Sequence, residues 1–281
     1  MSSRVSSQVT RTSHRRSIAI VPNREKIRAY HELPRLRQWL KKRGIAVLPL
    51  EQLEKAEMVL TLGGDGTILS IASRAARAGV PVLGVNIGRL GFMTAAELRH
   101  LYRVLDLWLH HRLVTSPRLM LEVTAPRIQI SLLALNDVVV RIASTPRVTN
   151  VVASFRGEEL GSFTGDGVII ATPTGSTAYS LAAQGPVIHP DVEAFVLTPI
   201  CAHSFRQRPV VFPAQQTLEL CLADQRKGNK VQLCLDGQRL FPLRHGDVVR
   251  VRKASYKLKL LQNPKVSYFE VLREKLSWGG R

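Results

Sequence analysis

The chain has 281 residues, of which 45% are hydrophobic and 22% charged, a balance typical of a soluble globular protein with about two domains. No stretch approaches the roughly 18 uncharged apolar residues of a membrane-spanning helix, and the apolar run at residues 17–22 is too short for a signal-peptide core, so we expect a cytoplasmic protein. The formal net charge of +19 favours polyanionic partners, such as nucleic acid, an anionic membrane or phosphate-rich small molecules.

The number of cysteines and the distribution of basic residues narrow the possible kinds of site and partner. The three cysteines are odd in number and form no Cys-x-x-Cys pair, which indicates neither a disulfide framework nor a thiolate metal cluster. Much of the positive charge falls in the helix-like residues 24–43, where it is typical of a solvated basic face. The aromatic stacking pattern of a single-strand nucleic-acid binder is absent from the sequence. We therefore expect no specific nucleic-acid partner, although a basic nucleic-acid-binding protein stays an alternative.

The first 113 residues alternate between strand and helix patterns. Residues 1–16 predict a disordered basic tail, because they are rich in serine and arginine and contain no acid. Alternation of strands with helices predicts a Rossmann-like parallel sheet over residues 17–113, in which ligands bind beyond the carboxyl ends of the strands. The predicted helices are 24–43, with a break at Pro34, 68–78 and 96–111; the predicted strands are 17–21, 46–50, 58–62 and 80–85.

A glycine-rich turn, Leu-Gly-Gly-Asp-Gly-Thr at residues 62–67, joins a strand to a helix. Its three glycines allow positive φ and close approach of a ligand, and Thr67 suits a helix N-cap. The unpaired N–H groups of such a turn suit a phosphate. Asp65 repels a phosphate unless a metal lies between them or the carboxylate meets a hydroxyl, which suggests phosphoryl transfer to an alcohol. An Asp-Gly turn without chemistry is the alternative.

A second glycine-bearing loop, residues 86–95, follows the next predicted strand. We expect its Gly88 and Gly91 to line the same cleft as Asp65, with a plain turn as the alternative.

From about residue 114 the sequence changes to short apolar, β-branched runs separated by glycine, proline and aspartate. This spacing predicts an all-β, sandwich-like domain over residues 114–262. The strands are expected at 119–123, 128–132, 138–142, 151–155, 168–172, 210–212, 218–222, 231–235 and 248–251.

Three segments of this domain carry more polar chemistry than strand packing needs. Asn136-Asp137 could read an adenine edge and a ribose diol, or simply form a turn. Residues 172–179, Thr-Pro-Thr-Gly-Ser-Thr-Ala-Tyr, lead into a predicted helix at 180–184; their small side chains admit a flat ring, and their hydroxyls suit phosphate or ribose oxygens. Residues 236–238, Asp-Gly-Gln, predict a hairpin turn on their own.

In their order along the chain, these motifs resemble the NAD kinase family, and the resemblance covers nearly the whole chain after the tail. The resemblance implies an α/β domain, a β domain and a cleft between them. It also implies transfer of a phosphoryl group to the 2′-hydroxyl of the adenosine ribose of NAD. The motifs that carry it are residues 63–67, 88–92, 136–137, 165–167, 172–179, 185–186 and 236–238.

Several partners follow from the resemblance. It implies a divalent metal, Mg²⁺ above all, ATP or polyphosphate as phosphoryl donor, and a homo-oligomer, dimer or tetramer, whose neighbour helps complete the site. The metal ligands are not assigned. Lipid or sugar kinases of the same superfamily stay an alternative because they share the opening motif. In the lipid kinases, however, an Asn-Glu pair follows that motif almost at once, whereas here residues 68–70 are Ile-Leu-Ser.

By the resemblance, Asp65 is the general base for the ribose hydroxyl, and Asn136 with Asp137 holds adenosine. Asp166 binds the nicotinamide half across a subunit boundary. The remaining residues implied to contact nucleotide are Gly66, Thr177, Ala178, Tyr179, Ser180, Ala182 and Gln238.

Two residues depart from the family pattern. Asp137 stands where the family usually has Glu, which shortens the reach of the carboxylate by roughly 1.5 Å, one C–C bond. Thr164 stands where a basic residue is common. The family also returns its last segment to the N-terminal domain, and we expect residues 263–281 to contain that return, with a strand at 266–272.

Overall fold

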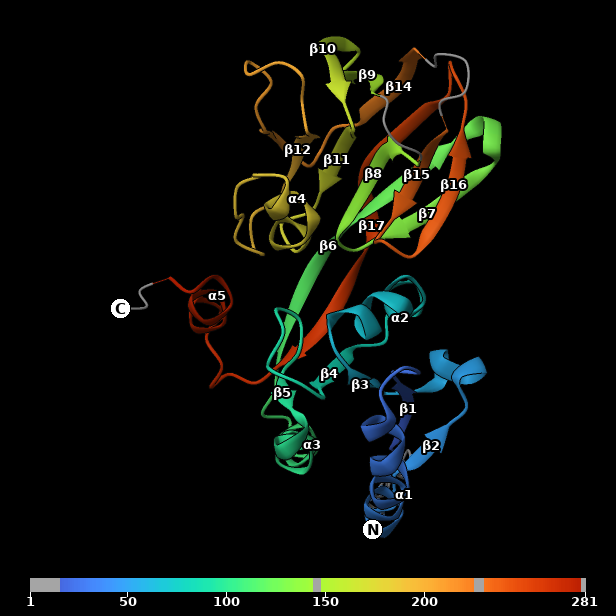
Figure 1. Ribbon diagram of the computed structural model, residues 1–281. Helices are drawn as coiled ribbons and strands as arrows, with labels where there is room; N and C mark the ends of the chain where they lie inside the picture. Colours follow the sequence, from blue (N-terminus) through green and yellow to red (C-terminus); the bar gives the residue numbers. More distant parts are fainter. Residues whose placement is uncertain (1–15, 144–147, 225–229, 279–281) are drawn as a thin grey trace, which may run out of the picture.

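The computed structural model describes residues 16–143, 148–224 and 230–278, so the predicted tail lies almost wholly outside the described residues. The described chain forms an 11-stranded mixed sheet and a six-stranded antiparallel sheet. Figure 1 shows a β-rich half above an α/β half, with the long strands β6 (Val114–Ala125) and β17 (Val248–Gln262) running between them. The fold class predicted from the sequence is therefore confirmed.

The α/β half is a parallel sheet with helices on both faces. Side chains alternate along β3: Val59 packs in one core with α2, whereas Met58 and Leu60 pack in another with α1 and α3. The sheet order is β4-β3-β1-β2. The strands are β1 (Ser17–Pro22), β2 (Ala46–Leu48), β3 (Met58–Gly63), β4 (Val82–Asn86) and β5 (Ala96–Glu97); the helices are α1 (Ile27–Lys42), α2 (Asp65–Ala78) and α3 (Leu101–Leu109), with 3₁₀ turns η1 (Leu50–Lys55) and η2 (Leu98–His100).

Three local predictions for this half are wrong. Helix α1 continues through Pro34 without a break, because its apolar face, including Leu36 and Leu40, is held in the core. Helix α2 begins at Asp65, which makes Thr67 its third residue and not its N-cap. The predicted helix at 96–111 begins only at Leu101, because residues 96–97 pair with β4 instead.

The β half packs two sheet faces around one apolar core, to which residues of β6, β8, β9, β11, β12, β14 and β15 contribute. The predicted strands are present, and three further strands, β10, β12 and β16, were not predicted. The remaining elements are β7 (Ile130–Ala134), β8 (Asp137–Ile142), β9 (Thr149–Phe155), β10 (Glu158–Gly165), β11 (Gly167–Ala171), β12 (Ala194–Ile200), β13 (Val210–Pro213), β14 (Leu218–Asp224), β15 (Val231–Leu235), β16 (Arg239–Leu243), η3 (Pro126–Ile128), η4 (Gly175–Thr177) and α4 (Tyr179–Ala182).

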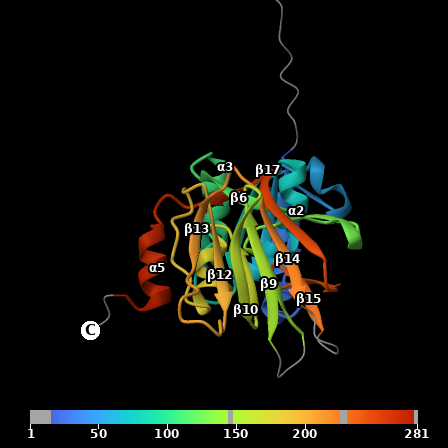
Figure 2. The same cartoon turned by 90° about the horizontal axis from the view of Figure 1, so that it is seen from above.

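The end of the chain returns to the α/β half through β17. Leu260 and Leu261 pair in parallel with Val82 and Leu83 of β4, so one 15-residue strand belongs to both halves. The strand predicted at 266–272 is wrong: helix α5 (Tyr268–Leu276) occupies this segment and lies at one margin of the molecule (Figure 2), with Val271 and Leu272 buried. No helix in the described ranges is long and apolar enough to cross a membrane.

Candidate active site

The glycine-rich turn connects the buried end of β3 to the start of α2. A Cβ added at Gly63 would lie 1.9 Å from Thr67 Oγ1, so this position excludes any side chain. The Thr67 hydroxyl accepts hydrogen bonds from Asn23 Nδ2 at 3.3 Å and from the Gly64 N–H at 3.4 Å. None of the three glycines uses the positive φ that glycine allows. Two of them provide access, since a Cβ at Gly66 would meet nothing within 4 Å and one at Gly64 nothing closer than 3.7 Å.

Asp65, the first residue of α2, points at the loop that follows β4. Its Oδ2 accepts a hydrogen bond from the Phe92 N–H at 3.0 Å, and its Oδ1 accepts one from the Met93 N–H at 3.1 Å. Gly91 makes this approach possible, because a Cβ there would lie 2.3 Å from Asp65 Oδ1. Gly91 therefore packs against Asp65, whereas Gly88 lines a different hollow; that both glycines line one cleft with Asp65 stays a prediction.

The surroundings of Asp65 make it a stronger base than an ordinary aspartate. Burial raises the pKa of its carboxyl, and the N–H groups of Met93 and Phe92 offset this only in part, with smaller contributions from the positive charges of Lys275 and Arg118. A half-buried carboxylate with raised pKa, fixed by two backbone donors, suits a general base.

Arg118 of β6 is a basic residue that sequence reasoning missed. It is buried, and its Nε has no hydrogen-bond partner among the described residues. It lines a cavity of about 260 Å³ together with Gly91, Phe92, His189 and Tyr268. Burial lowers the pKa of its guanidinium, opposed by the charges of Asp191, Tyr268 and Asp65. An arginine next to a predicted strand gives no signal that it will lie near a carboxylate 53 positions earlier.

The polar segments of the β half meet at one edge of the six-stranded sheet, where β8 begins and its neighbours β11 and β15 end. Antiparallel pairing sets Asp137 opposite Ala171, and Val138 opposite Leu235. The segments at 136–137, 172–179 and 236–238 are thereby brought together, although about 100 residues separate the first from the last. The structure thus assembles one site from motifs that the sequence shows only singly.

Asp236 organises this edge, whereas the sequence predicted only a hairpin turn there. It has φ of 50°, and its carboxylate accepts hydrogen bonds from the N–H groups of Leu135, Asn136 and Asp137 at 2.8, 2.7 and 3.2 Å. Asp236 therefore fixes the backbone at the start of β8. The sequence held no signal for this role, because the pairing of β8 with β15 is a long-range contact.

Asn136 and Asp137 are both buried at this edge. Asn136 Oδ1 has no hydrogen-bond partner among the described residues, which leaves an acceptor for a ligand. Burial, together with the charge of Asp236, raises the pKa of Asp137 to about 7. A ligand that donates a hydrogen bond to Asp137 would favour its charged form.

The turn after β11 is built directly on Asn136. The Thr172 N–H donates to the Asn136 carbonyl at 2.9 Å, and the Thr172 hydroxyl donates to the Leu135 carbonyl at 2.6 Å. A Cβ at Gly175 would lie 2.0 Å from the Asn136 oxygen, so only glycine lets the two backbones touch.

The end of this segment divides into surface and buried residues. Thr177 and Ala178 are half-buried, and Tyr179 and Ala182 are exposed. Ser180 is fully buried, and its hydroxyl shares a 2.8 Å hydrogen bond with the Thr198 hydroxyl. The helix α4 here begins one residue earlier than predicted and is shorter.

A side-chain hydrogen bond joins the two halves at the site. Gln238 Nε2, in the turn between β15 and β16, donates to the carbonyl of Gly66 at 3.1 Å. The turn that fixes Asn136 is therefore tied to the turn that carries Asp65.

Asp166 lies apart from the other predicted site residues. It precedes β11, whereas Thr172 follows it, and five strand residues at about 3.3 Å each place the two ends roughly 16 Å apart. The exposed Asp166 is next to Cys201, whose pKa its carboxylate raises through a hydrogen bond. Within one chain, the structure does not bring Asp166 to the edge that holds Asn136.

The described residues contain no group of three or more His, Cys, Asp or Glu side chains that could hold a metal ion. Asp65 is the only carboxylate of the described chain within the glycine-rich turn, and both its oxygens already accept N–H groups. These residues do not fit a resident Mg²⁺ site made by protein ligands alone. Mg²⁺ is commonly held by one or two carboxylates plus substrate phosphates, which is a different arrangement.

A Rossmann-like half that carries a fixed aspartate in a glycine-rich turn, tied to a β half with a buried polar edge, defines a class of nucleotide-dependent phosphotransferases. Comparison with known proteins identifies the family. Residues 50–113 match the ATP-NAD kinase N-terminal domain, and residues 135–263 match the ATP-NAD kinase C-terminal domain. The chain belongs to the NAD kinase family.

Two relatives and a solved structure agree with this family assignment. A NAD kinase of Geotalea daltonii is 42% identical over 231 residues, which cover 81% of each chain. A NAD kinase of Koribacter versatilis is 39% identical over 286 residues, covering 95% of this chain and 99% of its own. The crystal structure of a NAD kinase from Archaeoglobus fulgidus in complex with ATP superposes with a TM-score of 0.79 at 26% identity, covering 93% of this chain and 98% of that one.

Proposed function

We propose that this chain phosphorylates the 2′-hydroxyl of the adenosine ribose of NAD to make NADP, with Asp65 as the general base. The observation that carries the proposal is the position of Asp65: it starts α2, is held by two backbone N–H groups, and adjoins Gly66, whose carbonyl is bound by Gln238 of the adenosine edge. The comparisons favour this reaction over the lipid-kinase, sugar-kinase and nucleic-acid alternatives.

In this mechanism each half supplies one partner of the reaction. Asn136 and Asp137 hold adenosine. Thr177, Ala178 and Tyr179 border a nucleobase. The ribose hydroxyl passes its proton to Asp65 as its oxygen forms a bond to the terminal phosphorus of the donor. The bridging P–O bond to the next phosphate breaks, and the donor leaves shorter by one phosphate. Positioning and charge stabilisation dominate phosphoryl transfer, and the open space at Gly64 and Gly66 would let the phosphate approach the start of α2. ATP is a donor, as the Archaeoglobus complex supports, and Mg²⁺ would enter with the donor phosphates.

We further propose that the working enzyme is a homo-oligomer in which Asp166 completes a neighbour's site. The roughly 16 Å between the two ends of β11 supports this, because Asp166 cannot reach the adenosine edge of its own chain. Phe205, in the loop that follows β12 and Cys201, is 93% exposed and would be covered by a neighbour. The three free cysteines suit a reducing cytoplasm.

The experiment is an assay of NADP formation from NAD and Mg²⁺, with ATP or polyphosphate, for the wild type and Asp65→Asn. We expect the variant to lose about 10²-fold or more in kcat, because the amide cannot accept the hydroxyl proton. Circular dichroism of both proteins serves as the folding control. Unchanged turnover would remove Asp65 from the role of base, and a folded wild type that makes no NADP from either donor would refute the function.

A further inference from the structure

A cavity between helix α5 and strand β6 is not used by the reaction proposed above. It has a volume of about 260 Å³ and is lined by Tyr268 and Val271 of α5, by Ser116 and Arg118 of β6, and by Gly91 of the loop after β4. We call it the α5 cavity. Ser116 and Arg118 are two positions apart in the strand, so their side chains lie on the same face. Pockets for drug-sized ligands usually measure roughly 300–1,000 Å³, so this cavity suits a ligand smaller than a dinucleotide.

Arg118 brings a positive charge into the α5 cavity without a counter-ion. The residue is only 6% exposed, its Nε has no hydrogen-bond partner, and its guanidinium forms no ion pair within the described residues. A buried charge is strongly unfavourable unless an opposite charge and hydrogen bonds replace the water that it has lost. Burial accordingly lowers the pKa of the Arg118 guanidinium. Arginine nevertheless stays protonated in proteins, so the α5 cavity contains a cation that lacks a direct partner.

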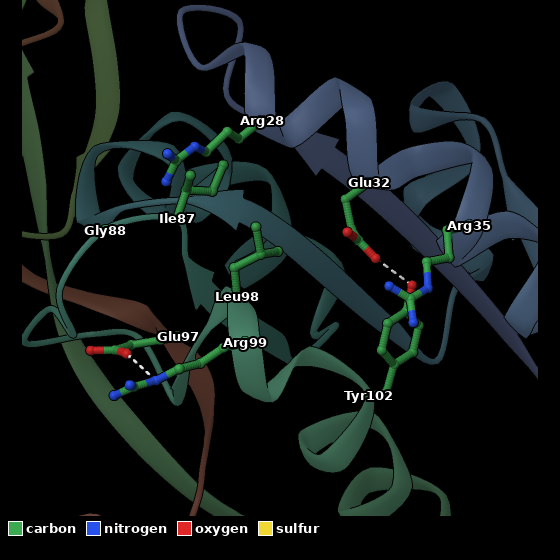
Figure 3. Close-up of a pocket in the computed structure, with 9 residues that line it drawn as sticks. All are labelled: Arg28, Glu32, Arg35, Ile87, Gly88, Glu97, Leu98, Arg99 and Tyr102. Carbon is green, nitrogen blue, oxygen red and sulfur yellow. Dashed lines mark hydrogen bonds and ion pairs between the residues drawn. The ribbon is translucent and has the colours of Figure 1, made fainter.

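Other arginines of this chain do not have this problem. Figure 3 shows Arg28, Arg35 and Arg99 around a hollow beside α1. All three are exposed, and Arg99 also pairs with Glu97 at 2.8 Å. Because water solvates exposed cations, their charge needs no ligand. Arg118 differs because the fold has removed it from water.

Two hydroxyl groups line the α5 cavity together with Arg118. The Tyr268 hydroxyl is buried and has no hydrogen-bond partner among the described residues. The edge of the His189 ring packs against the Tyr268 ring, with the ring centroids 4.9 Å apart. Ser116 supplies the second hydroxyl. A guanidinium and hydroxyls that come from a strand and from a helix suit the several oxygens of a phosphate ion.

The carboxylates near the α5 cavity do not act as the counter-ion. Asp191 lines the cavity, but its side chain is 76% exposed and lies 3.6 Å from His189 Nδ1. Asp65 accepts two backbone N–H groups. Both carboxylates attract the Arg118 guanidinium only through space, from beyond ion-pair distance. A direct counter-ion for Arg118 must therefore come from outside the described chain.

We propose that the α5 cavity binds inorganic phosphate, with the Arg118 guanidinium as its counter-ion and the Tyr268 hydroxyl as a further hydrogen-bond donor. The bound ion connects β6 to α5. It thereby holds the helix against the loop at residues 86–95, whose N–H groups fix Asp65. The phosphate is neither donor nor acceptor in the reaction proposed above, and its site does not depend on that reaction.

The test compares thermal unfolding with and without inorganic phosphate. At a phosphate concentration about tenfold above its Kd, the Tm of the wild type should rise by about 3–6 °C. Arg118→Met should lose most of this rise. Because this variant also removes a buried charge without a partner, its Tm without phosphate should be at least that of the wild type. Arg28→Met, at an exposed position outside the α5 cavity, is the control and should keep the full rise.

A milder variant tests the second donor. Tyr268→Phe removes only the hydroxyl, and titration calorimetry should show that it weakens phosphate binding about 3- to 10-fold through one lost hydrogen bond. Hydrogen exchange then locates the ion. Phosphate should slow amide exchange in α5 and in the loop at residues 86–95 of the wild type, but not in Arg118→Met.

ATP separates free phosphate from the phosphates of a nucleotide. It should raise the Tm of the wild type and of Arg118→Met equally, since its phosphates bind elsewhere. A phosphate response that survives in Arg118→Met, or protection confined to the start of α2, would overturn the proposal. So would an ATP response that is lost with Arg118, which would assign the cavity to a nucleotide. Should Arg118→Met not fold, an unchanged Kd in Tyr268→Phe would overturn it alone. None of these readouts measures NADP formation, so their failure leaves the proposed function intact.

Discussion

At the scale of single residues, the site depends on carboxylates that the fold buries. Asp137 is the clearest case, because burial and the charge of Asp236 raise its pKa to about 7. In the unfolded chain the pKa of an aspartate is about 3.9. The native state therefore binds more protons than the unfolded state between these two values, and stability falls as pH rises through this window.

We expect the Asp137→Asn variant to lose this pH dependence. Between pH 4 and 8 the free energy of unfolding of the wild type should fall by about 1–3 kcal/mol more than that of the variant. Urea unfolding at both pH values, without nucleotide, measures the difference. Asp106→Asn, at a half-exposed position near Arg43, is the control and should follow the wild type. Parallel pH profiles for wild type and Asp137→Asn would contradict the argument.

Gly91 is a second single-residue determinant. In the Gly91→Ala variant the new Cβ would lie 2.3 Å from Asp65 Oδ1 and would push the carboxylate away from the Phe92 and Met93 N–H groups. We expect kcat to fall about 10-fold or more through misplacement of the base. Unfolding stability should fall by about 1–3 kcal/mol through lost hydrogen bonds to a charged group.

Gly66→Ala is the matched comparison for stability. Its Cβ would meet no atom within 4 Å, and alanine favours the first turn of α2 over glycine. Thermal unfolding should therefore show that this variant is at least as stable as the wild type. Equal losses of unfolding stability in Gly91→Ala and Gly66→Ala would mean that the contact of Gly91 with Asp65 is unimportant.

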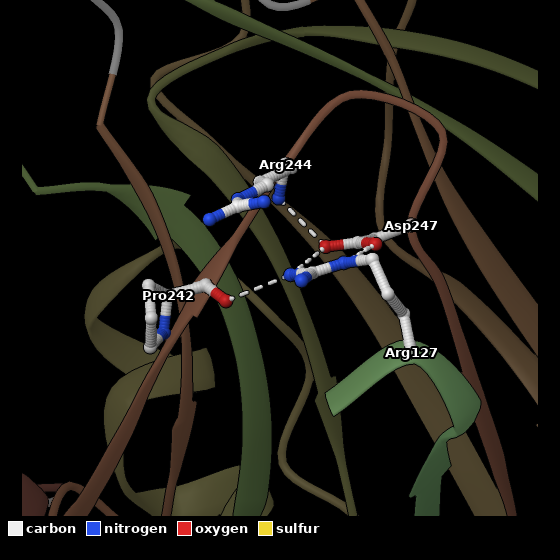
Figure 4. A network of polar contacts seen from close by, with 4 residues as sticks. All are labelled: Arg127, Pro242, Arg244 and Asp247. Carbon is white, nitrogen blue, oxygen red and sulfur yellow. Dashed lines mark hydrogen bonds and ion pairs between the residues drawn. The ribbon is translucent and has the colours of Figure 1, made fainter. Parts of the chain in front are cut away.

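At the scale of elements, buried charges join hairpins that are distant in the sequence. Figure 4 shows Arg127, in η3 between β6 and β7, bound through Nε and Nη2 to the buried Asp247, which immediately precedes β17. The Arg244 N–H also donates to Asp247 at 2.6 Å, and Arg127 Nη2 reaches the Pro242 carbonyl at 3.4 Å. Burial alone would raise the pKa of Asp247, but the hydrogen bonds from Arg127 and Arg244 outweigh it and lower the pKa.

We expect Asp247→Asn to cost about 2 kcal/mol of unfolding free energy at pH 7, because it removes the charge of the buried carboxylate that accepts the hydrogen bonds from Arg127. The pKa in the native state is below the unfolded value, so this contribution is present above about pH 4 and is lost as pH falls further. Glu122→Gln, which breaks the more exposed pair with Arg252, should cost under about 1 kcal/mol. A smaller loss for Asp247→Asn than for Glu122→Gln in chemical unfolding would argue against this account.

At the scale of the whole molecule, the position of Asp166 predicts complementation between subunits. Asp65→Asn and Asp166→Asn should each be nearly inactive alone. When the two are co-expressed, about a quarter of the sites in a statistically mixed homo-oligomer combine an intact Asp65 with a neighbour's intact Asp166. NADP formation by the mixture should recover to that extent.

The control for complementation pairs two residues that we assign to the same chain. Co-expression of Asp65→Asn with Asn136→Ala should give no recovery, because every site then contains one defect. Recovery of NADP formation in this control would contradict the subunit arrangement. So would the absence of recovery when Asp65→Asn is co-expressed with Asp166→Asn.

The sequence by itself determined the class of fold and the motifs of the site. Alternating strand and helix patterns predicted the parallel half, because local periodicity reports which side chains face a core. The glycine-rich turn with Asp65 was visible for a similar reason, since its residues are contiguous. The site roles carried over from the family resemblance, and the domain boundaries, stay predictions.

Only the tertiary structure decided how these pieces meet. Asp236 fixes the backbone of Asn136, and Arg118 lies near Asp65, through strand pairings between distant segments that no local pattern encodes. Of the three glycines of the turn, Gly63 is required for space, and none has positive φ; which position excludes a side chain depends on what packs against it. Helix α5 replaced a predicted strand because a short apolar run suits either structure, and burial of Val271 and Leu272 on one helical face decides between them.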